Sequence, residues 1–181
     1  MNRYSKITVI AIIAIVIPFV ISILNVIAVE QLENRWKDQG KFSLFALSNG
    51  GEVEFCNTMP YWMSFKKFEV STFYDLKSKG VFTTQPLTIN PGSYGFQNGT
   101  FYSDEFTASQ YLFLNLDFEF SGEDIRINPN KMYVLVNIST SIIVVIPYST
   151  TTQYTGFDFS NLMNNEKLSC WVNFYSYLLL T

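Results

Sequence analysis

Residues 53–70, VEFCNTMPYWMSFKKFEV, hold two runs of alternating apolar and polar residues separated by a segment that contains Pro60. A period of two is typical of a half-buried β-strand, because successive side chains point to opposite faces of a sheet. Residues 57–60 predict the turn that ends the first strand, and the aromatics Tyr61 and Trp62 are expected to pack just beyond it. This stretch therefore predicts strand, turn and strand.

The same period of two continues outward from this stretch over most of the chain. Turn signals recur about every 8–12 residues, a spacing typical of a β-sandwich. We expect tight turns at Asn49–Gly50 and at Asn98–Gly99, because asparagine and glycine supply the positive φ angles that such turns need. Candidate strands are residues 41–48, 52–55, 64–74, 80–85, 87–89, 100–106, 111–120, 131–139, 141–149 and 168–180, of which 111–120 alternates most clearly. The predicted fold is an all-β, antiparallel two-sheet β-sandwich, immunoglobulin- or fibronectin-like in the loose sense, preceded by one transmembrane helix.

An uncharged apolar run, ITVIAIIAIVIPFVISILNVIAV, occupies residues 7–29. A helix of about 20 apolar residues crosses the hydrocarbon core of a bilayer, so this run is long enough to span. Pro18 removes one backbone hydrogen bond, which Ser22 or neighbouring helices are expected to compensate. A cleaved signal peptide is the alternative, with small residues at Val26 and Ala28; the length of the run favours an uncleaved anchor.

Charges on the two sides of this run predict its orientation and the order of the domains. Arg3 and Lys6 precede it without a nearby acid, so the positive-inside rule leaves the N-terminus in the cytoplasm. We expect a cytoplasmic tail at 1–6, the transmembrane helix at 7–29, a linker or helix extension at 30–40, and an extracytoplasmic β-sandwich at 41–181. Trp36 is expected either at the lipid headgroups or packed on the domain.

The charged residues exclude several classes of function. Residues 30–181 carry ten basic and fifteen acidic residues, a net charge of −5, and show no basic stripe that would bind nucleic acid. The chain has no histidine, which removes the usual general base of hydrolytic triads and most zinc and copper sites. Asn115, Asp117 and Glu119 would share one face of a strand, where a solvated surface is favoured over a cation site. We assign no catalytic, metal-binding or cofactor-binding residue.

Two cysteines and two asparagines are candidates for covalent modification. Cys56 and Cys170 lie in the exported part, where an oxidising compartment permits a disulfide; two buried thiols are the alternative. Asn98 and Asn137 each begin an Asn-x-Ser/Thr sequence, the acceptor of N-glycosylation. Asn98, in an expected turn, is the better acceptor, whereas Asn137 lies near the end of a strand.

Residues 53–101 resemble the late-embryogenesis-abundant group 2 family, also called the water-stress and hypersensitive-response (WHy) domain. The resemblance rests on Phe68-Glu69-Val70, on Gly80-Val81-Phe82, and on the turn at residues 88–93, TINPGS. The family's adjacent Asn-Pro is replaced here by residues 57–60, NTMP. The resemblance implies a small β-sandwich behind a membrane helix, a role in stress protection or membrane-associated interaction, and no catalytic residues.

The expected function is a non-enzymatic, single-pass membrane-anchored extracytoplasmic domain that binds or stabilises other components, including as an accessory subunit of a membrane complex. We expect a protein partner at the membrane surface and no nucleic acid, and we name no small-molecule ligand. One alternative is a sugar- or lipid-binding β-sandwich that uses an aromatic surface. Its candidate residues are Tyr61, Trp62, Tyr94, Phe96, Phe101 and Tyr102. A histidine-free hydrolase that works through carboxylates is the third candidate.

Overall fold

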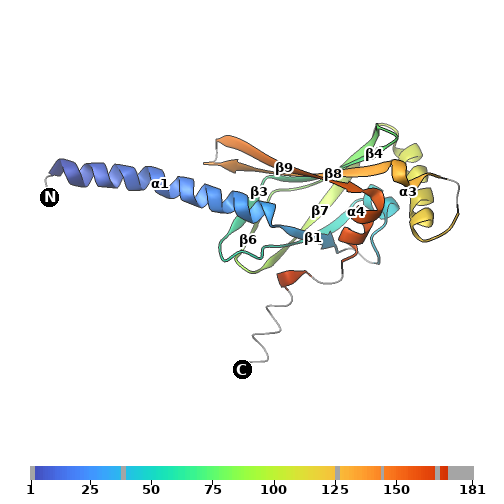
Figure 1. Cartoon of the computed structure of the whole chain (residues 1–181), viewed down its shortest axis with the longest axis horizontal. Helices are drawn as coiled ribbons and strands as arrows, with labels where there is room; N and C mark the ends of the chain where they lie inside the picture. The colour runs from blue at the N-terminus through green and yellow to red at the C-terminus, as the bar shows by residue number, and fades with distance from the viewer. Residues whose placement is uncertain (1–2, 38–39, 125–126, 144, 166–167, 171–181) are drawn as a thin grey trace, which may run out of the picture.

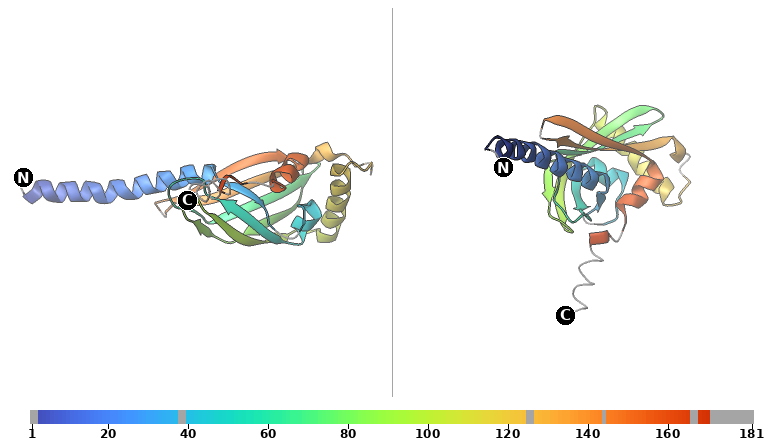
Figure 2. Two further views of the ribbon diagram at one scale, coloured as in Figure 1. Left: turned by 90° about the horizontal axis from the view of Figure 1, so that it is seen from below. Right: turned by 60° about the vertical axis from the view of Figure 1, so that its left-hand side comes forward.

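A computed structural model of the chain shows a β-rich body with one long helix projecting from it (Figure 1). It describes residues 3–37, 40–124, 127–143, 145–165 and 168–170. Helix α1 extends from one end of the body and helix α3 lies across the opposite end, as two further views confirm (Figure 2). The body therefore has a proximal end, next to α1, and a distal end, next to α3.

Nine strands form the body's two antiparallel sheets. They are β1 (Glu33–Trp36), β2 (Gly51–Cys56), β3 (Met63–Phe65), β4 (Lys67–Tyr74), β5 (Lys77–Thr84), β6 (Leu87–Ile89), β7 (Tyr94–Tyr102), β8 (Met132–Ile142) and β9 (Ile146–Thr155). Seven of them make one curled sheet in the order β1-β2-β7-β5-β4-β8-β9, while β3 and β6 pair separately. The prediction of a mostly antiparallel β fold is confirmed. The predicted two-sheet sandwich is wrong, because one large curled sheet holds seven strands and the second sheet is only the short pair of β3 and β6.

Helices and a short 3₁₀ turn are the other elements in the described part of the chain. They are α1 (Arg3–Glu30), α2 (Leu44–Ser48), α3 (Phe106–Phe120), the turn Pro129–Lys131 and α4 (Gly156–Met163). Helix α4 packs against β8 and against β1 and β9, the two edge strands of the large sheet. This helix therefore covers the gap that the curled sheet leaves between its edges.

Residues 111–120 belong to α3, so the strand predicted there is wrong. Ser109, Phe113 and Leu116 are buried at intervals of four and three residues, which is helical spacing. Apolar side chains occupy every even position, but residues 112, 113, 116 and 120 also recur at intervals of three and four residues, so the pattern fits a helix as well as a strand. Packing decides: as a helix, α3 places Phe113 and Leu116 against the open distal end of the sheet.

The predicted strand at residues 41–48 is also wrong, because residues 44–48 form helix α2. Ser43 caps α2 by accepting a hydrogen bond from Ala46 N, and Asn49 ends the helix. Gly50 follows with φ +79°, so the expected Asn-Gly turn is a helix terminus and not a hairpin. Both oxygens of Asp117 accept backbone N–H groups of α2, from Leu44 and Phe45, each at 2.8 Å.

Three further segments differ from their predicted structure. Residues 33–36, expected in a linker or helix extension, form the edge strand β1. The expected turn at Asn98–Gly99 lies inside β7, and residues 100–102 continue that strand. Residues 141–149 hold the turn of a hairpin, since β8 ends at Ile142 and β9 begins at Ile146. Residues 171–181, most of the predicted C-terminal strand, lie outside the described residues.

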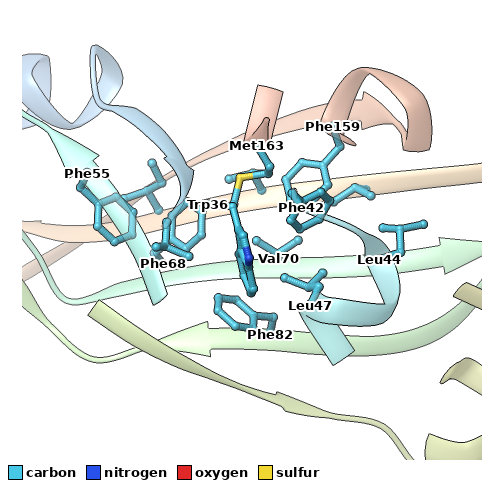
Figure 3. Packing of buried hydrophobic residues seen from close by; sticks show 14 of the residues in the cluster. Trp36, Phe42, Leu44, Leu47, Phe55, Phe68, Val70, Phe82, Phe159 and Met163 are labelled. Atoms are coloured by element: carbon cyan, nitrogen blue, oxygen red, sulfur yellow. The ribbon is translucent and has the colours of Figure 1, made fainter. Parts of the chain in front are cut away.

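The core fills the concave side of the large sheet, with Trp36 near its centre (Figure 3). The Trp36 ring lies 5.4 Å from that of Phe42 and 6.1 Å from that of Phe82, and the Phe42 ring is 5.4 Å from that of Phe159. Trp36 is 7% exposed, so it packs in the domain and does not lie at lipid headgroups. The edge strand β1 is thus held by its tryptophan as well as by its pairing with β2.

The core is packed closely against Gly99. A Cβ at Gly99 would lie 2.0 Å from Cζ of Phe82, whereas a Cβ at Gly95, in the same strand, would meet the flexible end of Leu87 at 3.0 Å. We expect Gly99→Ala to lower the free energy of unfolding by about 1–3 kcal/mol, because Phe82 must leave its rotamer. Urea unfolding of the full-length chain in mild detergent measures this, with Gly95→Ala as the matched control. Equal losses in the two variants would contradict the packing described.

Candidate functional site

The last two turns of α1 form part of the body. Ser22, Asn25, Ala28 and Val29 recur at intervals of three or four residues, so they share one face of the helix. Ala28 and Val29 are each 1% exposed and belong to the main core cluster. The end of the apolar helix is therefore packed as a core element, and we call this region the junction.

Asn25 makes the central contacts of the junction. Its Oδ1 accepts a hydrogen bond from Ser64 N at 2.6 Å, and its Nδ2 donates to Ser64 O at 3.0 Å and to Thr140 Oγ1 at 2.9 Å. The side-chain amide thus pairs with the backbone of Ser64 as a neighbouring strand would. Thr140 Oγ1 also donates to Ser64 O at 2.9 Å, so α1, β3 and β8 meet in one network.

Two side-chain contacts flank Asn25. Ser22 Oγ accepts a hydrogen bond from Ile143 N at 2.8 Å, in the turn that joins β8 to β9. This hydroxyl was expected to compensate for Pro18, and the structure instead shows it bonded to the body. At the helix end, Tyr148 donates to the carboxylate of Glu30, and this hydrogen bond raises the pKa of Tyr148 above its ordinary value.

The preceding part of α1 projects away from the body (Figure 1). Its large apolar side chains from Ile7 to Ile21 are exposed around the helix, whose surface is apolar on every side. Ile7–Glu30 is the one described helix long and apolar enough to cross a membrane. A signal sequence near an N-terminus meets the same criteria of length and composition.

A second exposed apolar region lies at the distal end, on the outer side of α3. Tyr111, Leu114 and Phe118 follow one another at helical intervals and are 71%, 38% and 39% exposed. We call these three residues the α3 face. The exposed acids Asp104, Glu105 and Glu123 lie just before and after the helix, and α3 itself contains no basic residue. The apolar α3 face is therefore flanked by negative charge.

Cys56 and Cys170 are joined by a disulfide in the structure, with their Cα atoms 5.9 Å apart. Both half-cystines are buried, beside Leu168. Next to them, Ser169 donates to Glu33 from its backbone N and its hydroxyl, at 2.7 and 2.6 Å. Residues 168–170 are thus fixed against the start of β1 and the end of β2.

The two glycosylation candidates occupy different surroundings. Asn98 is exposed on β7, where its register partner in β2 is Glu52. Asn137 is partly buried in the middle of β8, between the register partners Glu69 and Thr151. Exposure favours Asn98 over Asn137, although Asn98 lies in a strand and not in a turn; the use of either site stays a prediction.

The aromatic residues considered for ligand binding do not form one platform. Tyr94 and Tyr102 are the two ends of β7, about 26 Å apart at 3.3 Å per residue. Trp62 is 69% exposed before β3, whereas Phe101 is partly buried against Phe106 and Phe113. An open groove of about 560 Å³ lies over β4, β8 and β9 and is lined by Lys67, Glu69 and Tyr148, among others.

Asn115, Asp117 and Glu119, considered as oxygen ligands on one strand face, lie on α3 instead. Asn115 Nδ2 donates to Tyr111 O at 2.8 Å. Burial raises the pKa of Asp117, and the N–H donors of Phe45 and Leu44 offset part of that rise. The described residues contain no cluster of three or more His, Cys, Asp or Glu side chains that would hold a metal ion.

Two functional features were missed by sequence reasoning. Asn25 lies within the apolar run at residues 7–29, where an amide is costly unless it finds a partner, so it marks a contact. The turn between β8 and β9 was hidden inside an apolar stretch. Its signal was Pro147, which is confined to strand edges or ends.

Comparison with known proteins adds little to this description. No family model and no curated protein matches the chain. The chain is similar to a solved structure of a protein from Archaeoglobus fulgidus, over 68% of this chain and 94% of that one, at 10% identity and a TM-score of 0.30. A likeness at this level carries no argument about fold or function.

We expect Asn25→Leu to weaken the junction. The change removes the amide that pairs with Ser64 and costs about 1–2 kcal/mol in the free energy of unfolding, the usual value for lost hydrogen bonds of this kind. Urea unfolding of the full-length chain in mild detergent measures the loss. Asn161→Leu, at an exposed position of α4, is the matched control and should leave stability nearly unchanged. A loss no greater than that of the control would show that the amide network does not support the fold.

Proposed function

We propose that the protein is a non-enzymatic, single-pass membrane protein whose body lies outside the cytoplasm and binds a partner protein at the membrane surface. One observation carries the proposal: α1 is apolar and exposed over its first part, and is packed into the body over its last two turns. A helix of this kind anchors the body directly, without an intervening flexible linker.

Packing of the junction favours an uncleaved anchor over a signal peptide. Cleavage after Ala28 would remove Ser22 and Asn25, and with them the hydrogen bonds to Ile143, Ser64 and Thr140. It would also remove a buried residue of the core, Ala28 itself. A signal sequence destined for removal has no reason to supply such contacts.

The orientation rests on charge and on cysteine chemistry. Arg3 and Lys6 before the span favour a cytoplasmic N-terminus. The pairing of Cys56 with Cys170 suits an oxidising compartment, where disulfides persist. Both observations support an extracytoplasmic body.

The α3 face supports a partner-binding role, as in an accessory subunit of a membrane complex. It lies at the end of the body opposite α1, so the anchor holds it away from the bilayer (Figure 2). Apolar residues rimmed by charge are typical of protein interaction sites. The acids that flank this face favour a partner whose own apolar surface is rimmed by basic residues.

The other candidates have less support. A sugar- or lipid-binding module needs its aromatic residues gathered, and here they lie at both ends of the body. A carboxylate hydrolase needs a raised pKa in a cleft, whereas both oxygens of Asp117, the carboxyl group whose pKa is raised, are occupied by N–H groups of α2. The stress-protective role implied by the WHy resemblance stays a prediction.

Labelling of single cysteines in intact cells tests the anchor and its orientation. We expect a membrane-impermeant maleimide to label Leu76→Cys, at the 85%-exposed turn after β4, and to label Ser5→Cys only after permeabilisation. Intact-mass measurement should show that the purified protein keeps residues 1–29. A measured mass that matches a chain beginning near residue 29, or labelling of Ser5→Cys in intact cells, would refute the anchor as proposed.

Extraction in mild detergent followed by mass spectrometry tests the partner. We expect a stoichiometric protein to co-purify with the wild-type chain and to be reduced at least several-fold by Leu114→Glu, which places a charge in the α3 face. Leu76→Glu puts the same charge on an exposed leucine outside α3 and should leave the partner bound. Recovery of a lone monomer in several detergents would contradict the subunit role.

A further inference from the structure

The turn between β8 and β9 presents an apolar surface to solvent. Ile142, Ile143, Val145 and Ile146 surround this turn, and we call these four residues the hairpin tip. Val145 is 83% exposed and Ile146 is 52% exposed. Ile142 and Ile143 are half-buried, whereas the aliphatic side chains of Val145 and Ile146 are left for an external partner to cover.

The hairpin tip lies beside α1, within the stretch of helix that a bilayer would cover. Ile143 N donates to Ser22 Oγ at 2.8 Å, and Figure 1 shows the hairpin extending along the helix past the rest of the body. The helix from Ile7 to Ile21 is about 22 Å long at 1.5 Å per residue. A hydrocarbon core is about 30 Å thick, so a span that begins after Lys6 reaches roughly 8 Å beyond Ile21. Ser22 and the adjacent tip therefore fall inside the apolar layer.

The chemistry of the hairpin suits that depth. From Met132 to Thr155 the two strands and their turn contain no charged residue. The bilayer core penalises unpaired backbone groups, and here Ile143 N is satisfied by Ser22 while Pro147 has no N–H to leave unpaired. Lys66 and Lys67 follow β3 at the same end, where Lys66 N bonds to Ser139 O, and would lie near the headgroups.

We propose that the hairpin tip inserts into the leaflet that faces the body and forms a second membrane contact beside α1. The inference rests on the proposed anchoring by α1 and goes beyond it. A single helix leaves the body free to rotate about the helix axis and to tilt. Insertion of the tip on one side of α1 stops the body from rotating about the helix axis. It thereby fixes the orientation of the α3 face relative to the bilayer.

Depth-dependent quenching of a fluorescent label tests the insertion. Full-length Val145→Cys carries bimane and is reconstituted into phosphatidylcholine–phosphatidylglycerol vesicles that contain lipids with nitroxides at shallow or deep acyl positions. The native cysteines are joined to each other and do not take the label. Leu76→Cys, an exposed aliphatic residue at a distal turn, is the matched control, and Ile15→Cys reports on α1.

We expect shallow nitroxides to quench the label at residue 145 several-fold more than the label at residue 76, and deep nitroxides to quench it less than shallow ones. If the label at residue 145 is quenched no more than the label at residue 76, while the label at residue 15 is quenched, the tip is not inserted and anchoring by α1 stands. If residue 15 is not quenched, the anchor fails and the inference fails with it. If the emission of the label at residue 145 is blue-shifted but no lipid nitroxide quenches it, the tip is covered by a second copy of the chain instead of by lipid. That result also overturns the proposal.

Discussion

A single curled sheet has no second sheet of its own size to pack against, so other parts of the chain must fill its concave side. In this protein that filling comes from the small β3–β6 sheet, from the C-terminal end of α1, and from helices α2, α3 and α4. Phe82 illustrates the constraint: its ring occupies the space above Gly99 and contacts Trp36, which belongs to an edge strand. The body depends on burial contributed by segments that a sandwich would place outside its core.

The same constraint joins the anchor to the body. The last turns of α1 are among the segments that close the proximal end, and Asn25 ties them to β3 and β8. Helix and body therefore form one packed unit, in contrast to a domain tethered by a mobile linker. In our proposal this unit carries the α3 face at the distal end and the hairpin tip at the proximal end, so membrane contact and partner contact are held in a fixed geometry.

Most strands could be predicted from the sequence because alternation is a local property: β2, β4, β5 and β8 lie where their period of two places them. The errors occurred where the local pattern fits two structures and packing chooses between them. Residues 111–120 alternate as a strand does, but residues 112, 113, 116 and 120 also fit helical spacing, and only the open end of a curled sheet makes the helix favourable. β1 is four residues long and is fixed by the burial of Trp36, which no local pattern shows. At the site, the apolar span was visible in the sequence, whereas the contacts of Asn25 and Ser22 depend on residues 39 to 121 positions away.

The disulfide has a mechanical consequence for a protein held between a membrane and a partner. Cys56 and Cys170 enclose most of the body in one covalent loop, whereas α1 and β1 lie outside it. Tension between α1 and the α3 face would first load the junction, where Asn25 bonds to β3 and β8, and after its rupture β1 in its pairing with β2. Beyond Cys56 the load divides between the two arms of the loop, because α3 lies near the middle of the loop in sequence. The chain would then lengthen only if both arms unravelled together, so the bridge limits how far the body can be stretched while it remains attached at both ends.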